Sequence, residues 1–101
     1  MNDNEIIQLF FTRNEDAISQ TACRYGGQLT RLSENILRNK EDAQECVSDT
    51  YLRVWNSVPP QRPHFLAAFL GRIARNLALN RRAAANAEKR GGGEAELSLE
   101  E

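Results

Sequence analysis

The sequence has few of the residues from which catalytic and metal-binding sites are built. Its 101 residues include one histidine and two well-separated cysteines, Cys23 and Cys46. One imidazole and two such thiols are too few for a zinc site or a disulfide framework. Cys46 has the acidic neighbours Glu45 and Asp49 instead of the basic surroundings that activate a thiol, so both cysteines are predicted to pack in or beside the core. We expect no enzyme activity, no metal and no cofactor.

Long apolar runs, basic N-terminal residues and strand patterns are also missing. No run approaches the roughly 18 apolar residues of a membrane span. The residues after Met1 lack the positive charge of a secretory signal. The predicted location is therefore the cytoplasm, with reduced thiols. Alternation at period two never persists, so we predict one all-α domain.

The spacing of apolar residues predicts a short first helix and a long second one. Asn2 or Asp3 can cap the first helix, and Asn14 can cap the second. The stripe of the first helix consists of Ile6, Ile7, Phe10 and Phe11. The stripe of the second consists of Ile18, Ala22, Tyr25, Leu29, Leu32 and Ile36. Gly26 and Gly27 indicate either a bend in this helix or a close approach by another one.

A third helix is predicted over residues 40–57. Asn39, followed three residues later by Asp42, resembles a capping box. The side expected to face the core holds Ala43, Val47, Thr50, Tyr51, Val54 and Val58. The opposite side holds Glu45, Ser48, Asp49, Leu52 and Asn56. Pro59 and Pro60 end the helix because neither can donate a backbone hydrogen bond.

All three prolines lie between Ser57 and His64, which predicts a stiff, extended loop. A fourth helix is expected to begin near His64 or Phe65. Its core stripe consists of Leu66, Phe69, Leu70, Ile73 and Leu77. A separate side of it holds Arg72, Arg75, Asn76 and Arg82. The predicted architecture is a compact bundle of three to four helices with a proline-rich loop between the last two.

Charge is distributed unevenly along the chain. Residues 61–90 hold seven Lys or Arg and one Asp or Glu, whereas residues 1–60 hold six and nine. Residues 91–101 hold four glutamates and no basic residue, and three glycines precede them. This tail is expected to begin a flexible acidic linker. A basic block beside an acidic one favours two partners, one of them nucleic acid, although a solvated arginine face explains the charge equally well.

The fourth helix and the loop form a candidate nucleic-acid surface. Arginines at helical spacing fit a phosphate backbone, and asparagines such as Asn76 and Asn80 could touch bases. Trp55, His64 and Phe65, near the ends of the loop, could stack on unpaired bases. For Trp55 and Phe65, packing at the boundary of the core is the favoured alternative.

The outer side of the third helix forms a candidate protein-binding surface. Leu52 lies there among the charges of Glu45 and Asp49, with Arg53 adjacent. An exposed leucine among charged residues suits a protein contact. An ordinary solvated face with one scattered leucine explains the same pattern.

Two segments carry a resemblance to a known family. They are EDAQECVSDTYLRVW, residues 41–55, and FLGRIARNLALNRR, residues 69–82. With a proline loop between them, they resemble region two of bacterial sigma factors, and most closely the compact extracytoplasmic-function group of the sigma-seventy superfamily. The likeness covers residues 3–90. Two matching segments at the family's separation make a specific signal.

The resemblance implies a function in transcription initiation. Region two of that family binds the clamp helices, a coiled coil of the beta-prime subunit of RNA polymerase. It also recognises the minus-ten promoter element and traps the melted non-template strand. The implied polymerase contacts are Glu45, Ser48, Asp49, Leu52 and Arg53. The implied DNA contacts are Asn56, Ser57, Pro60, Gln61, Arg62, His64, Arg72, Arg75, Asn76, Asn80 and Arg82.

The loop has a particular role in that group, because it receives a base flipped out of the stack. A loop shaped in advance by proline loses less order on binding, which fits this task. The sequence departs from the family pattern at Asn80, where an aspartate is usual, and at Gly26 and Gly27. The family's second DNA-binding domain, a helix-turn-helix, is absent. We therefore expect residues 1–90 to be the region-two domain and residues 91–101 to begin a linker to a missing C-terminal domain.

An anti-sigma factor is a further expected partner, and no membrane contact is expected. The alternative hypothesis is a helical interaction module that imitates a sigma domain. Such a module would occupy polymerase or an anti-sigma factor without recognising DNA. It would need the acidic face of the third helix but not the arginines of the fourth.

Overall fold

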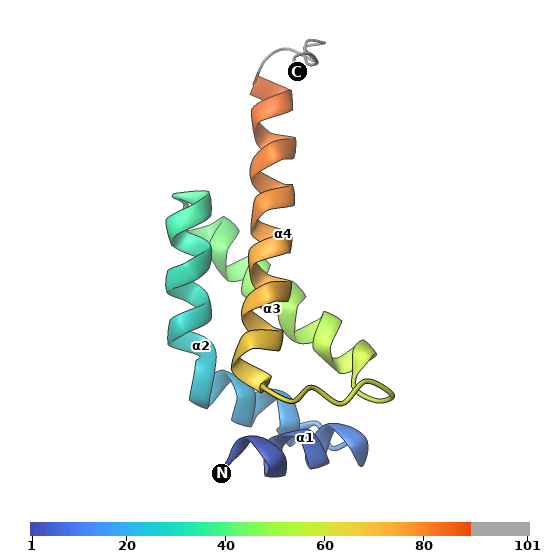
Figure 1. Ribbon diagram of the computed structural model, residues 1–101. Helices are drawn as coiled ribbons and strands as arrows, with labels where there is room; N and C mark the ends of the chain where they lie inside the picture. The colour runs from blue at the N-terminus through green and yellow to red at the C-terminus, as the bar shows by residue number, and fades with distance from the viewer. Residues whose placement is uncertain (90–101) are drawn as a thin grey trace.

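The computed structural model describes residues 1–89, which form four α-helices (Figure 1). They are α1 (Asp3–Phe11), α2 (Asp16–Leu37), α3 (Lys40–Ser57) and α4 (Leu66–Lys89). The predicted all-α bundle is confirmed, and no strand occurs in this part of the chain. The expected linker at residues 91–101 lies outside the described residues. Among the described helices, none is both long and apolar enough to cross a membrane.

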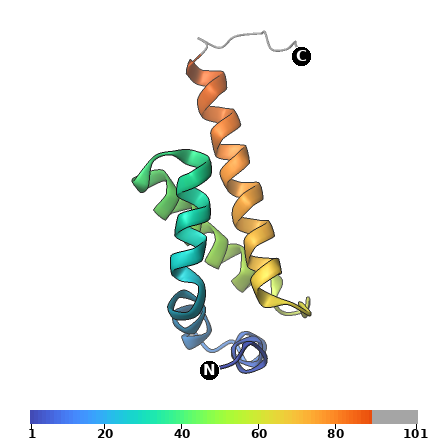
Figure 2. The ribbon, with the colours of Figure 1, turned by 60° about the vertical axis from the view of Figure 1, so that its left-hand side comes forward.

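Three helices pack against one another, and the fourth closes one end of the bundle. Helices α2, α3 and α4 are in mutual contact, while α1 packs mainly on α2. Helix α1 lies across the end at which α4 begins, and α4 extends past the other helices at the opposite end (Figures 1 and 2). The connection from α3 to α4, residues 58–65, runs at the same end of the bundle as α1 (Figure 1). This arrangement puts α1 next to the segment predicted to recognise DNA.

Helix α1 is held by its cap and by three buried side chains. The Asn2 side chain accepts a hydrogen bond from the Glu5 backbone N–H at 2.8 Å, and the Glu5 carboxylate accepts one from the Asn2 N–H at 2.9 Å. This reciprocal pair is a capping box, so the predicted cap at Asn2 is confirmed. Ile6, Ile7 and Phe10 are buried, and they fix the helix on the bundle.

The start of α2 differs slightly from the prediction. Glu15 occupies the cap position without a side-chain hydrogen bond, and the helix begins at Asp16. The Asn14 side chain still accepts from the Asp16 backbone N–H at 2.9 Å. Asn14 therefore stabilises the turn before the helix, one residue earlier than a regular cap.

The buried stripe of α2 is also different from the predicted one. Its buried residues are Ala17, Thr21, Tyr25, Leu29 and Ser33. Ile18, Leu32, Ala22 and Ile36, which were predicted to form the stripe, are only half-buried. The Thr21 hydroxyl donates to the Ala17 carbonyl at 2.7 Å, and this bond lets a polar residue occupy the core. A pattern based on hydrophobicity alone assigns such a residue to the surface.

The two glycines of α2 have different surroundings. A Cβ added at Gly26 would lie 3.4 Å from the Tyr51 hydroxyl oxygen of α3, whereas one at Gly27 would meet no atom within 4 Å. The helix continues through both residues without interruption. A contact at 3.4 Å with the end of a tyrosine side chain is an ordinary one and does not by itself require glycine, whereas the axis of α2 does change direction along its length (Figure 1).

Helices α3 and α4 supply the rest of the core. Asn39 caps α3 by accepting from the Asp42 backbone N–H at 2.9 Å, and α3 ends at Ser57 as predicted. The residues of α4 that are buried are Leu66, Leu70, Ala74 and Ala78. The buried Cys46 thiol donates to the Ala74 carbonyl at 3.4 Å. Phe69, Ile73 and Leu77 of the predicted stripe are half-buried. At the contact between Cys46 and Ala74, α3 and α4 thus meet through small buried residues.

Candidate nucleic-acid and protein interfaces

The outer face of α3 is exposed along its whole length. The predicted protein-binding residues Glu45, Ser48, Asp49, Leu52 and Arg53 are all exposed. The Leu52 side chain is 58% exposed, so it is free to make an apolar contact with a partner. Glu45, Asp49 and Leu52 recur at intervals of four and three residues, so they form one continuous stripe. Arg53 lies on the flank of this stripe.

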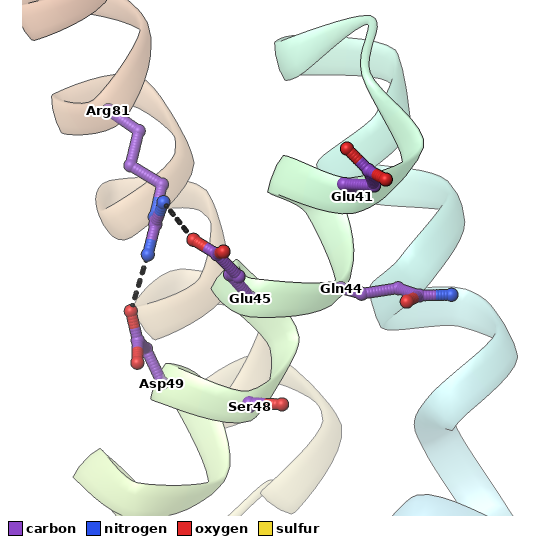
Figure 3. A pocket seen from close by; sticks show the side chains of 6 residues that line it. All are labelled: Glu41, Gln44, Glu45, Ser48, Asp49 and Arg81. Carbon is purple, nitrogen blue, oxygen red and sulfur yellow. Dashed lines mark hydrogen bonds and ion pairs between the residues drawn. The ribbon is translucent and has the colours of Figure 1, made fainter.

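A feature that the sequence analysis did not identify is the pairing of this acidic stripe with α4. The Arg81 guanidinium reaches from α4 to two carboxylates one turn apart on α3 (Figure 3). Its Nη1 lies 3.0 Å from Oε1 of Glu45, and its Nη2 lies 2.8 Å from Oδ2 of Asp49. Arg81 thus partly neutralises the two acids predicted to bind polymerase.

The same contacts affect the ionisation of Arg81. Its hydrogen bond to Asp49 is the largest influence, and with the contact to Glu45 it raises the pKa of the guanidinium above the ordinary value. The two carboxylates therefore stabilise the charged form, which every arginine already has at physiological pH. The three side chains, together with Glu41, Gln44 and Ser48, line a shallow open groove (Figure 3).

The outer face of α4 carries positive charge instead. The predicted DNA-binding residues Arg72, Arg75, Asn76, Asn80 and Arg82 are all exposed. At about 100° per residue they spread over roughly 160° of the helix surface, with Asn80 and Arg82 on opposite flanks of Arg72. Leu79, 39% exposed, lies within this face. Among the described side chains, no ion pair involves Arg72, Arg75 or Arg82.

The last turn of α3 and the connection to α4 carry the remaining predicted DNA-binding residues. Asn56, Pro60, Gln61, Arg62 and His64 are exposed. Ser57 is half-buried, and its carbonyl accepts from the Gln61 backbone N–H at 3.0 Å. This bond closes a turn after α3.

Phe65 contradicts the prediction that it packs at the boundary of the core. Its side chain is 77% exposed. Phe65 is the residue immediately before α4, and its carbonyl accepts from the Phe69 N–H at 3.0 Å. The helix therefore orients Leu66, and not Phe65, toward the core. The result is an exposed aromatic ring at the junction of the connection and the basic helix.

Trp55 shows the opposite behaviour and lies at the core boundary, as the favoured alternative predicted. It is half-buried, and its ring centroid lies 6.1 Å from that of Phe10. The Arg13 guanidinium carbon covers the ring at 3.8 Å from the centroid. One face of the indole is thus occupied from within the protein, in a typical cation–π contact.

The two cysteines also differ from each other. Cys46 is buried, as predicted, whereas Cys23 is exposed on α2. The prediction that both pack in or beside the core is therefore wrong for Cys23. Cys23 lies between Thr21 and Tyr25 in sequence but outside the buried stripe to which they belong.

Comparison with known families gives this geometry its context. The family model for Sigma-70 region 2 matches residues 21–88, more than half of the chain. The chain therefore belongs to the Sigma-70 region 2 family, as the resemblance predicted. Region 2 of sigma factors is a non-catalytic domain that acts in promoter recognition and in binding to RNA polymerase. Searches of curated proteins and of solved structures gave no match.

The family match begins inside α2. Helix α1 and the turn that follows it precede the matched residues. Arg13, which contacts Trp55, belongs to this preceding part. The family pattern alone consequently gave no reason to consider Arg13.

Proposed function

We propose that this domain binds the clamp helices of the polymerase beta-prime subunit through α3 and recognises the minus-ten promoter element through α4 and the connection before it. In this proposal residues 1–90 are a region-two domain of the extracytoplasmic-function type. The domain traps the melted non-template strand, and polymerase carries out the chemistry. An anti-sigma factor is a further proposed partner.

The observation that carries the proposal is the exposure of two oppositely charged faces on neighbouring helices of a Sigma-70 region 2 domain. Glu45, Asp49 and the exposed Leu52 offer a protein partner acidic groups around an apolar contact. Arg72 and Arg75 offer DNA two cations that have no carboxylate partner among the described side chains. Two different partners can occupy these faces at the same time.

The connection supports a role with unpaired bases. Phe65 presents an exposed ring at the start of α4, the helix that carries Arg72 and Arg75, and His64 is exposed next to it in the chain. Exposed aromatic rings beside a positively charged surface bind single strands by base stacking, at about 1–3 kcal/mol per stacked base. A base flipped from the duplex could stack on Phe65 while Arg72 and Arg75 hold the adjacent phosphates.

The division between the faces is tested by two substitutions. Arg75→Ala is expected to weaken promoter opening and leave the affinity for core polymerase within about twofold, because Arg75 points about 120° around α4 from Arg81, the residue that contacts Glu45 and Asp49. Asp49→Ala is expected to weaken binding to core polymerase. Promoter opening is read from a fluorescent base in the minus-ten element, and polymerase binding from fluorescence anisotropy. If Arg75→Ala weakened both properties equally in a folded protein, the proposed division would be wrong.

A further inference from the structure

The turn between α1 and α2 lies against the connection from α3 to α4. Arg13, in this turn, donates from one guanidinium nitrogen to the Trp55 carbonyl at 2.9 Å and to the Val58 carbonyl at 3.0 Å. Its guanidinium also lies on the Trp55 ring. One side chain thus contacts the last turn of α3 and the first residue of the connection.

The sequence of the connection explains why the Trp55 carbonyl has no backbone donor. In a continuous helix the Trp55 carbonyl would accept from the N–H of residue 59, but Pro59 has none. The two bonds at this helix end that the backbone does supply are Val58 N–H to Val54 and Gln61 N–H to Ser57. Arg13 therefore provides the hydrogen bond that Pro59 cannot. A cation at the C-terminus of α3 is also favoured by the helix dipole.

The backbone of Arg13 is adapted to this position. Its φ angle is 58°, in the left-handed region that few non-glycine residues adopt. The Arg13 N–H donates to the Phe10 carbonyl and the Asn14 N–H to the Leu9 carbonyl, which closes the end of α1. This conformation turns the chain sharply after α1, next to the end of α3.

A second cation–π contact joins the end of α1 to the connection, this time with the arginine on the connection and the aromatic ring on α1. Arg62, in the middle of the connection, lies with its guanidinium carbon 4.9 Å from the ring centroid of Phe11. Arg13 therefore stacks on an aromatic residue at the end of α3, while Arg62 stacks on one at the end of α1. The two contacts fix the connection at two points, next to Trp55 where it begins and at Arg62 in its middle.

We propose that Arg13, supported by Phe11, is a positioning residue that holds the α3–α4 connection in the conformation that selects bases. This inference rests on the proposed function, because it requires that the connection contacts DNA. It extends that function to a segment that precedes the residues matched by the family model. Arg13 acts through the connection and does not itself read a base.

The test compares Arg13→Gln, Arg13→Lys and Phe11→Leu with the unchanged chain. Each protein is titrated into labelled single-stranded oligonucleotides that differ by one base, in the presence of a clamp-helix fragment. For Arg13→Gln, the ratio of affinities for the best and the poorest base is expected to fall roughly tenfold. Arg13→Lys keeps the charge but loses the planar stack, so its affinity ratio should lie between those of the unchanged chain and Arg13→Gln. Phe11→Leu should lower the ratio about two- to threefold.

Arg24→Gln is the matched control. Arg24 also lies beside an aromatic ring, that of Tyr25, and pairs with Asp3 of α1, but it does not contact the connection. This variant loses the same charge at the α1–α2 contact and should keep the full base preference. Trp55 is the only tryptophan, so its fluorescence and its quenching by acrylamide report directly on the loss of Arg13. Trp55 should respond to Arg13→Gln and not to Arg24→Gln.

Salt dependence separates positioning from a direct phosphate contact. A positioning residue leaves the slope of log affinity against log salt unchanged, whereas loss of one phosphate contact reduces it by about 0.7 for a single strand. Reduced base preference with an unchanged slope supports the proposal. Unchanged preference, with or without a reduced slope, overturns it.

Failure of the proposed function is distinguishable from failure of this inference. If the unchanged chain showed no base preference, the proposed function would be wrong. The proposed role of Arg13 in base selection would then be wrong as well. If the unchanged chain discriminates and Arg13→Gln discriminates equally, only the present inference fails. Should circular dichroism show Arg13→Gln unfolded, Arg13→Lys and Phe11→Leu decide the matter under the same criteria.

Discussion

The outer faces of α3 and α4 each carry charged side chains around one exposed leucine. They differ in the sign of those charges and in whether the charges are paired within the domain. On α3, the carboxylates of Glu45 and Asp49 are already paired with Arg81. On α4, Arg72 and Arg75 have no such partner among the described side chains. A partner of the acidic face must therefore share or displace an internal cation, whereas a partner of the basic face meets uncompensated charge. We infer that apolar contact dominates binding at α3 and that electrostatics dominates at α4.

The largest expected effect is the loss of affinity when the exposed leucine of either face is replaced by aspartate. Leu52→Asp places a charge at the centre of the α3 stripe and should weaken clamp-helix binding by more than about 30-fold, as loss of a central hot-spot residue does. Leu79→Asp, on α4, should leave clamp-helix binding unchanged and weaken DNA binding. Both leucines are substantially exposed, so the folded state should persist in each variant. Anisotropy titrations with each partner measure both effects, and equal loss of both partners in either variant would contradict the division.

An effect of intermediate size is expected in the salt dependence of the two interactions. DNA affinity should fall steeply with salt, and Arg75→Gln should reduce the slope for a single strand by about 0.7. Clamp-helix affinity should depend weakly on salt, because Arg81 already neutralises part of the acidic face. Titrations between low and moderate salt with each partner provide the comparison. A steeper slope for the clamp helices than for DNA would reverse the assignment of the faces.

The smallest expected effect concerns the ion pairs between the faces. Arg81→Gln should lower the free energy of unfolding by less than about 1 kcal/mol, because both pairs are solvent-exposed. It should also increase clamp-helix affinity slightly, since Glu45 and Asp49 are no longer paired. Urea denaturation and anisotropy measure the two quantities. A loss of several kcal/mol would instead make Arg81 a structural residue of the bundle.

Most features of the two outer faces could be predicted from the sequence, because they depend on the spacing of residues within a single helix. The bounds of α3, the exposure of Leu52 and the exposure of Arg72 and Arg75 follow from helical spacing and from two prolines that end the helix. These features require no knowledge of how the helices cross. The assignment to the family followed from two segments that lie within α3 and α4.

Contacts between residues far apart in the chain could not be predicted in the same way. The pairing of Arg81 with Asp49 depends on the crossing of α3 and α4, which periodicity does not determine. The exposure of Phe65 depends on where α4 begins, and a shift of one residue exchanges it with Leu66. The burial of Thr21 depends on a hydrogen bond within its own helix.

One feature of the sequence could have helped to predict the contact of Arg13 with the end of α3. A helix that ends before two consecutive prolines has carbonyl groups for which the backbone offers no donor. The sequence therefore indicated that the end of α3 offers carbonyl groups to an external donor, either a side chain or water. It could not indicate that the donor comes from residue 13, which precedes α3 by more than a whole helix.

The central claim, that one face binds polymerase and the other recognises DNA, is tested most directly by one titration. Labelled single-stranded oligonucleotides of varied sequence are titrated with the domain, with and without a beta-prime clamp-helix fragment. We predict sequence-dependent binding that appears or tightens when the fragment is present. Binding to the fragment with no affinity for any oligonucleotide would contradict the claim, and the arginines of α4 would then be an ordinary solvated surface.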